Sequence, residues 1–168
     1  MYQFAALMLG DQTQALDLVE STVASVEVDP CADPGVAKGL VRERVLDGAL
    51  EIMQRQDPAS FSQVPAADPT GSCIEDDTVP LSGTEISELV AGAGRGPLRD
   101  WLARLTQAQR AVFVQRAVLG RSNAETARAI NRHAKPSVWT AEAVGGLFRQ
   151  ALCSLTSAML QSVPAARV

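Results

Sequence analysis

The chain has 168 residues, of which 46 % are hydrophobic and 4 % aromatic. Such a composition favours helices, because β-rich chains rely on aromatic and β-branched residues. No apolar run reaches the roughly 18 residues that a membrane-spanning helix needs, and the start MYQFAALMLGDQTQ lacks the basic region of a signal peptide. We therefore expect a cytoplasmic protein without a membrane segment.

The net charge of −4 hides an uneven distribution. Residues 1–97 hold 5 Lys and Arg against 16 Asp and Glu, a net charge of −11, whereas residues 98–168 hold 10 against 3, a net charge of +7. This asymmetry favours two modules with different partners. A basic half attracts phosphate backbones, although its arginines could instead serve only to solubilise an Ala-rich bundle.

The first module is predicted to span residues 1–56. A helix begins at Tyr2 and ends at Gly10, and a second begins after Asp11, which with Gln14 forms a weak capping box. The stretch DPCADPG interrupts the helical pattern because each proline disfavours helix in the residue before it. A third helix is predicted over about 36–56. Its expected inward residues are Leu40, Val41, Val45, Ala49, Leu50 and Met53.

Residues 57–96 are predicted to form an acidic linker rich in proline and serine. The part from 57 to about 83 holds four prolines and two glycines, which is linker chemistry. The stretch TEISELVAGAG that follows could form a short helix. We expect proteases to cut between residues 57 and 83 first and to release two stable fragments.

The second module is predicted to span residues 97–162 and to contain four helices. Capping boxes at 106–109 and 122–125 open two of them, and Gly120 suits the position after a helix end. A polar turn leads to a last helix over about 141–161, capped by Thr140. The sequence thus predicts an all-α fold of two small modules, the second containing a helix-turn-helix.

No catalytic or metal-binding constellation is visible. The three cysteines are far apart and form no CxxC pair, and the single histidine cannot build a metal site alone. No nucleophile–base pair and no phosphate-binding glycine spacing are present. We therefore expect reduced thiols, no cofactor, no metal and no enzymatic activity.

Both ends of the chain resemble sigma-70-type RNA polymerase sigma factors, especially the small extracytoplasmic-function group. The stretch LTQAQRAVFVQRAVLGRSNAETARAI resembles region 4, in which a Leu-Pro-x-x-x-Arg start, an apolar helix, a glycine and a capped S-x-x-E-[IT]-A helix follow in order. Thr106 replaces the usual proline. The stretch YQFAALMLGDQTQALDLVESTV resembles the start of region 2. The resemblance covers roughly residues 1–26 and 98–160.

The resemblance implies partners and site residues. In the family, region 2 binds the largest subunit of RNA polymerase and opens the −10 element, while region 4 binds the second largest subunit and reads the −35 element. By this resemblance the polymerase-binding residues are Asp17, Leu18, Val19 and Glu20. The candidate DNA-binding residues are Arg121, Ser122, Arg128, Arg132, Lys135, Thr140, Arg149 and Gln150. Promoter DNA is a further partner, and an anti-sigma factor is a candidate partner.

The chain departs from the family at two places. The stretch VAKGLVRERVLDGALEIMQRQ contains no aromatic residue that could stack on an unpaired base. The helix VWTAEAVGGLFRQAL carries Gly145 and Gly146 at positions we expect to face outward, where base readout needs long polar side chains. The glycines could allow close approach to another backbone, the readout could lie in the long basic turn, or the glycine face could be a protein contact.

Three functional hypotheses follow. The first is a sigma-factor-like transcription regulator that associates with polymerase and binds promoter DNA. The second is a sigma mimic, an interaction protein that binds an anti-sigma factor or polymerase without opening promoters. The third is a plain helix-turn-helix regulator that uses only residues 98–160.

Overall fold

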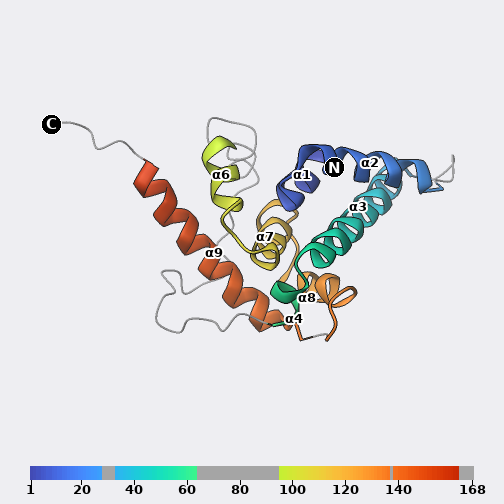
Figure 1. Ribbon diagram of the computed structural model, residues 1–168. Helices are drawn as coiled ribbons and strands as arrows, with labels where there is room; N and C mark the ends of the chain where they lie inside the picture. The colour runs from blue at the N-terminus through green and yellow to red at the C-terminus, as the bar shows by residue number, and fades with distance from the viewer. Residues whose placement is uncertain (28–32, 64–94, 137, 163–168) are drawn as a thin grey trace.

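The computed structural model describes residues 1–27, 33–63, 95–136 and 138–162, and over these residues the fold is all-α, as predicted (Figure 1). The described elements are α1 (Tyr2–Leu9), α2 (Gln12–Ser25), α3 (Pro34–Gln56), α4 (Pro58–Ser62), α6 (Arg95–Leu102), α7 (Gln107–Phe113), the π-helix η1 (Val114–Val118), α8 (Asn123–Asn131) and α9 (Ala141–Ser162).

Local sequence signals set the ends of the N-terminal helices. Gly10 terminates α1 in the left-handed region, with φ +73°, a conformation that glycine adopts without steric cost. Asp11 then caps α2, because its Oδ1 accepts the backbone N–H groups of Thr13 and Gln14. The predicted capping box is not completed. The Gln14 side chain instead accepts a hydrogen bond from Gln56 at the end of α3.

The C-terminal helices begin and end close to the predicted positions. Thr106 and Gln109 form a complete capping box at the start of α7. The helix continues into the π-helical turn η1, which the sequence pattern does not reveal, and the segment ends before Gly120, with φ +65°. A helix end at Gly120 was predicted from the glycine alone, and its positive φ confirms that reasoning.

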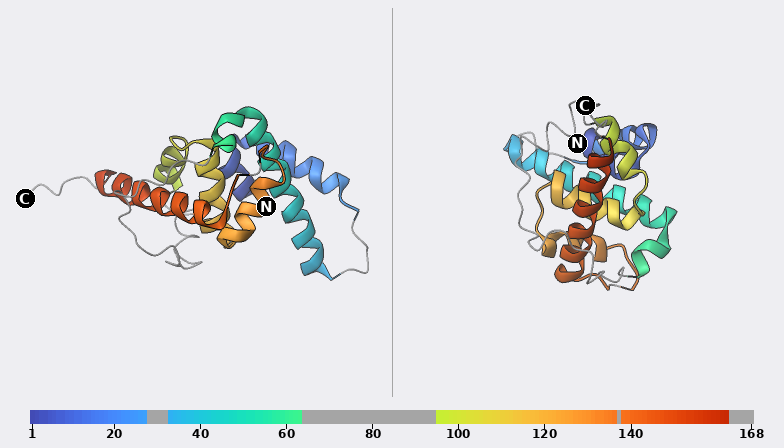
Figure 2. Two further views of the ribbon diagram at one scale, coloured as in Figure 1. Left: turned by 90° about the horizontal axis from the view of Figure 1, so that it is seen from below. Right: turned by 90° about the vertical axis from the view of Figure 1, so that its left-hand side faces the viewer.

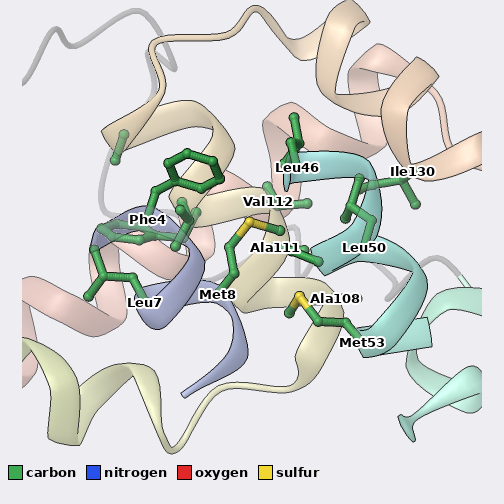
Figure 3. Close-up of a cluster of buried hydrophobic side chains, with 14 of the residues drawn as sticks. Phe4, Leu7, Met8, Leu46, Leu50, Met53, Ala108, Ala111, Val112 and Ile130 are labelled. Atoms are coloured by element: carbon green, nitrogen blue, oxygen red, sulfur yellow. The ribbon is translucent and has the colours of Figure 1, made fainter. Parts of the chain in front are cut away.

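The two halves of the chain share one hydrophobic core. Buried side chains from α1 (Met8), α3 (Leu50, Met53), α7 (Val112) and α8 (Ile130) belong to the same cluster (Figure 3). Helix α7 contacts α1, α3 and α4 on one side and α9 on the other. The two predicted modules therefore pack against each other through one continuous core.

The arrangement places α7 at the centre of the molecule (Figures 1 and 2). Helices α1, α2 and α3 lie to one side of it, while α6 and the long α9 lie to the other. Helix α8 packs against α9, and Trp139, which precedes α9, is hydrogen-bonded to Phe61 of α4. This last grouping brings the end of α3 to the predicted helix-turn-helix.

Some sequence predictions are wrong in detail. The segment from residue 57 is not linker throughout, because Asp57 caps the short helix α4 and Phe61 is buried. Leu40, expected inward, is 48 % exposed, and Leu46 is buried instead. The reason is that the buried face of α3 follows its contacts with α1, α2 and α7, whereas a helical pattern shows only where apolar residues recur. The possible helix within TEISELVAGAG lies outside the described residues.

Candidate nucleic-acid interface

Helix α8, the first helix of the predicted helix-turn-helix, is firmly capped. Ser122 Oγ accepts the backbone N–H of Glu125 at 3.2 Å, and the Glu125 carboxylate accepts the backbone N–H of Ser122 at 2.8 Å. The same carboxylate accepts the Ser122 hydroxyl at 2.7 Å. These hydrogen bonds hold the pKa of Glu125 below its ordinary value, because they stabilise the charged form. Ser122 is thus fixed as the N-cap of α8.

The turn between the two helices is closed by Asn131. Its Nδ2 donates to the carbonyl of Trp139 at 2.7 Å, and its Oδ1 accepts the backbone N–H of Trp139 at 3.1 Å. Thr140 Oγ1 then accepts the N–H of Ala143 at 3.1 Å and caps α9, as predicted. The expanded turn therefore ends at a fixed point directly before the predicted recognition helix.

The predicted DNA-binding residues lie in different surroundings. Arg128 and Lys135 are exposed, and the Arg128 Nε donates to the carbonyl of Ala124 within α8. Ser122 and Thr140 are exposed as caps, whereas Arg149 and Gln150 are half-buried further along α9. The structure brings Arg121, Arg128, Arg132 and Lys135 together on and around α8 and leaves Arg149 and Gln150 apart from them.

Two of these arginines are paired with carboxylates of α3. Arg121 Nη1 lies 3.0 Å from Oε2 and 3.3 Å from Oε1 of Glu43. Arg132 Nη2 lies 2.5 Å from Oδ1 of Asp47, and Arg132 Nε lies 3.1 Å from the same oxygen. Sequence reasoning missed Glu43 and Asp47 as part of this surface. The available signal was their spacing of one helical turn and the opposite charges of the two halves.

The end of α3 and α4 faces the turn across a hollow of about 470 Å³. The lining residues include Arg55, Arg132, His133 and Lys135, with Glu51 among them. His133 Nε2 lies 3.6 Å from Asp47 Oδ1 and makes no hydrogen bond. Cationic groups thus gather at the turn, and α3 supplies most of the opposing charge.

The two glycines of α9 do not face outward, which corrects the sequence prediction. Gly145 and Gly146 are both buried. Gly145 precedes Phe148 by three residues and Leu152 by seven, and both of these side chains are buried. The buried face of α9 is therefore wider than predicted, because it also includes Gly145 and Phe148. The glycine positions are part of the packed interior rather than a DNA-reading face.

The predicted polymerase-binding residues divide into two pairs on α2. Asp17 and Glu20 are exposed, whereas Leu18 and Val19 are half-buried and pack against the core. Leu18 Cδ1 approaches α3 so closely that a Cβ built on Gly48 would lie 2.6 Å from it. Leu16, on the same helix, is 46 % exposed. The surface of α2 that a partner can reach therefore includes Leu16, Asp17 and Glu20 but little of Leu18.

Arg110 is a buried cation with a different task. It is 8 % exposed, and its pKa is lowered because burial disfavours the charged form. Nε donates to the carbonyl of Leu102 at 3.1 Å, and Nη1 donates to the carbonyl of Met8 at 3.4 Å. These carbonyls lie in the last turns of α6 and α1, where the helix dipole favours positive charge. Arg110 therefore joins the two halves of the chain and is no part of the candidate interface.

The thiol prediction is wrong for Cys153, which is disulfide-bonded. The spacing argument failed because residues far apart in sequence can meet in space, and the other two cysteines, Cys31 and Cys73, lie outside the described residues. Among the described residues, no group of three or more His, Cys, Asp or Glu side chains could hold a metal ion. No helix of the described part of the chain is long and apolar enough to cross a membrane.

No family model, curated protein or solved structure matches this chain. The proposed function therefore depends on the chemistry of the predicted helix-turn-helix, on the exposed face of α2 and on the sequence resemblance described above.

Proposed function

We propose that the chain is a sigma-factor-like transcription regulator that binds DNA through α8 and α9 and RNA polymerase through α2. The observation that carries the proposal is the cluster of Arg121, Arg128, Arg132 and Lys135 around a helix-turn-helix whose helices are both capped. Guanidinium and ammonium groups beside a helix N-terminus are the groups that bind phosphates.

The DNA contacts in this proposal are made mainly to the backbone. The first turn of α9 offers Ala141 and Glu142 as exposed residues, and neither provides the donors that read base edges in the major groove. Gly145 and Gly146, which follow, are buried. The affinity therefore comes from phosphates and depends on salt, with little discrimination between sequences.

A binding measurement with duplex DNA tests the first half of the proposal. The native chain should bind random-sequence and promoter-derived duplexes with similar affinity at low salt. Arg128→Ala and Lys135→Ala should weaken binding to all sequences alike, each flattening the log–log salt dependence by about one unit. Arg104→Ala, which removes one exposed positive charge outside the cation cluster and outside α8 and α9, is the control. A sharp sequence motif selected by the native chain at physiological salt would contradict backbone-driven binding.

Run-off transcription with core polymerase tests the second half. A sigma-like regulator should bind core polymerase and direct initiation, and core polymerase without the chain is the control. A chain that binds polymerase without supporting initiation would instead be a sigma mimic. The specific observation in favour of that second candidate is the shared core, in which buried side chains from both halves form one cluster. Sigma regions 2 and 4 act at separate promoter elements, and two halves that share a core cannot easily separate to reach both.

A further inference from the structure

Helix α3 presents two carboxylates to the cationic surface of the helix-turn-helix. Glu43 and Asp47 are four residues apart, so they lie on one face of α3. One is paired with Arg121 and the other with Arg132. In each pair the guanidinium donates to a carboxylate oxygen, which is the same type of acceptor that a DNA phosphate offers.

The neighbouring contacts fix α3 in this position. Gln54 Nε2 on α3 donates to the carbonyl of Ile130 on α8 at 3.1 Å. Trp139 Nε1, in the residue before the α9 cap, donates to the carbonyl of Phe61 on α4 at 2.9 Å. Phe61 and Trp139 are both buried. The carboxylates are therefore held beside the arginines by packing and hydrogen bonds that do not depend on the ion pairs.

We propose that Glu43 and Asp47 occupy Arg121 and Arg132 in place of DNA phosphates, and that this intramolecular contact lowers the affinity of the helix-turn-helix for DNA. The inference rests on the proposed DNA-binding function. It adds that the native chain uses only part of its cationic surface until these two pairs separate. Arg128 and Lys135 pair with no carboxylate of α3 in the described part of the chain and remain available to phosphate throughout.

Separation of the pairs does not require the shared core to open. The Arg132 side chain is 46 % exposed and that of Asp47 34 % exposed, so Arg132 can turn toward a phosphate at the surface. Arg121 is more enclosed, with 16 % of its side chain exposed, while Glu43 is 44 % exposed. Exposed ion pairs are weak and are screened by salt. A polyanion in the correct place can therefore compete with the two carboxylates.

The test compares two double variants of the full chain in binding a random-sequence 30-base-pair duplex by fluorescence anisotropy. Glu43→Gln with Asp47→Asn removes the two competing charges and keeps the side-chain shapes. Glu27→Gln with Asp100→Asn removes two charges from exposed positions that lie outside the candidate interface and pair with neither Arg121 nor Arg132, and is the matched control. Circular dichroism and thermal unfolding verify that both variants keep the native fold.

Freed arginines should each add a phosphate contact. The Glu43→Gln/Asp47→Asn variant should bind about tenfold more tightly than the native chain at 50 mM salt, with a log–log salt slope steeper by about one to two units. The control should stay within about threefold of the native chain. Adding Arg132→Ala to the charge-removed variant should take back about one unit of slope, which a general loss of negative charge would not explain.

Two results would overturn the inference, and they differ in what they say of the proposed function. If the native chain binds the duplex and the two double variants bind alike, then α3 does not compete, while DNA binding by the helix-turn-helix stands. If neither the native chain nor the charge-removed variant binds the duplex at 50 mM salt, the DNA-binding function itself fails, and the inference fails with it. If the double variant does not fold, Asp47→Asn alone gives the same comparison with half the expected effect.

Discussion

At the scale of single residues, the buried Arg110 connects the two halves of the chain. A single guanidinium satisfies the carbonyls of Met8 and Leu102, one from each half of the chain. Its position against Gly10 is so close that a Cβ on that glycine would lie 2.6 Å from Nη1. The left-handed end of α1 at Gly10 leaves room for the Arg110 guanidinium, and this one side chain joins α1 to α6 and α7.

Arg110→Met should destabilise the chain by about 2 kcal/mol. Methionine fills a similar volume but removes the guanidinium donor from the Met8 carbonyl and leaves the Leu102 carbonyl with only the N–H of Leu105. The loss costs about 1–3 kcal/mol, which the relief of burying a charge partly offsets. Urea denaturation measures the change in the free energy of unfolding. Arg104→Met is the control, because Arg104 is exposed and should change stability by less than about 0.5 kcal/mol. Equal stability of the two variants would show that Arg110 contributes nothing as a link.

Gly145 provides a second residue-scale prediction. Because it is buried, Gly145→Lys should destabilise the fold by at least about 1–3 kcal/mol through overpacking and burial of an ammonium group. Ala141→Lys adds the same side chain at an exposed position of the first turn and should leave the fold intact. Thermal unfolding separates the two. Unchanged stability of Gly145→Lys, with tighter DNA binding, would mean that Gly145 faces outward after all.

At the scale of helices, the capping of α8 leads to a pH-dependent prediction. The folded-state pKa of Glu125 lies below its ordinary value of 4.5, chiefly because of the hydrogen bond from the Ser122 side chain. A depressed carboxylate pKa stabilises the fold above the unfolded-state pKa, and this contribution is lost as the pH falls through the folded-state value. Titration of the Glu125 side chain by NMR should give a midpoint below 4.5 that rises in Ser122→Ala. An unchanged midpoint in Ser122→Ala would contradict the assignment of the cause.

The exposed and the half-buried residues of α2 are expected to have different roles, the first in binding a partner and the second in packing. Leu16→Lys with Glu20→Lys changes exposed residues, so the fold should persist while affinity for core polymerase falls by about tenfold or more, as loss of an anchor side chain does at interfaces. Leu18→Lys places a charge against Gly48 of α3 and should destabilise the fold. Core-polymerase affinity and circular dichroism distinguish the two. Unchanged affinity of the first variant, with the fold intact, would exclude this face of α2 as the polymerase contact.

The helix ends could be predicted from sequence because they are determined locally. Ser122, Thr106 and Thr140 each satisfy backbone donors within three residues, so a short stretch contains the whole cause. Pairing between helices has no such local cause. The exposure of Leu40, the burial of Gly145 and the pairing of Arg121 with Glu43, 78 residues away, all depend on which helix faces contact each other.

The candidate site was accordingly only partly predictable. Arg128 and Lys135 were identified from the charge of the turn and are exposed, as a DNA contact requires. Arg121 and Arg132 were identified by the same reasoning, but their partners on α3 were not. The sequence shows the net charge of each half but not which side chains of the two halves contact each other. Helical periodicity predicts which residues share one face of a helix, but it does not predict which other helix packs against that face.

At the scale of the whole molecule, the shared core determines how the chain responds to cutting. The composition of residues 57–83 favours cleavage there, and two stable fragments were expected to result. Buried residues such as Met53 on α3 and Ala108 on α7 belong to one cluster, so neither half contains a complete core. The halves are therefore expected to depend on each other for folding, even though charge and composition divide the sequence between them.

A chain supplied as two pieces, residues 1–63 and 95–168, should fold only when the pieces are mixed. Each piece alone exposes the apolar surface that its partner covers, and a 63-residue helical piece without that cover has too little core for stability. Circular dichroism should show weak, non-cooperative unfolding of each piece and one cooperative transition of the equimolar mixture, which should also co-elute in size exclusion. Reductant must be present so that a disulfide cannot hold the pieces together. Ala111→Asp in the second piece, at a buried position of α7, should prevent assembly, whereas Ala103→Asp at an exposed position should not. Cooperative folding of either piece alone would show that the two halves are independent modules, and the shared core would then be a docking surface rather than the basis of the fold.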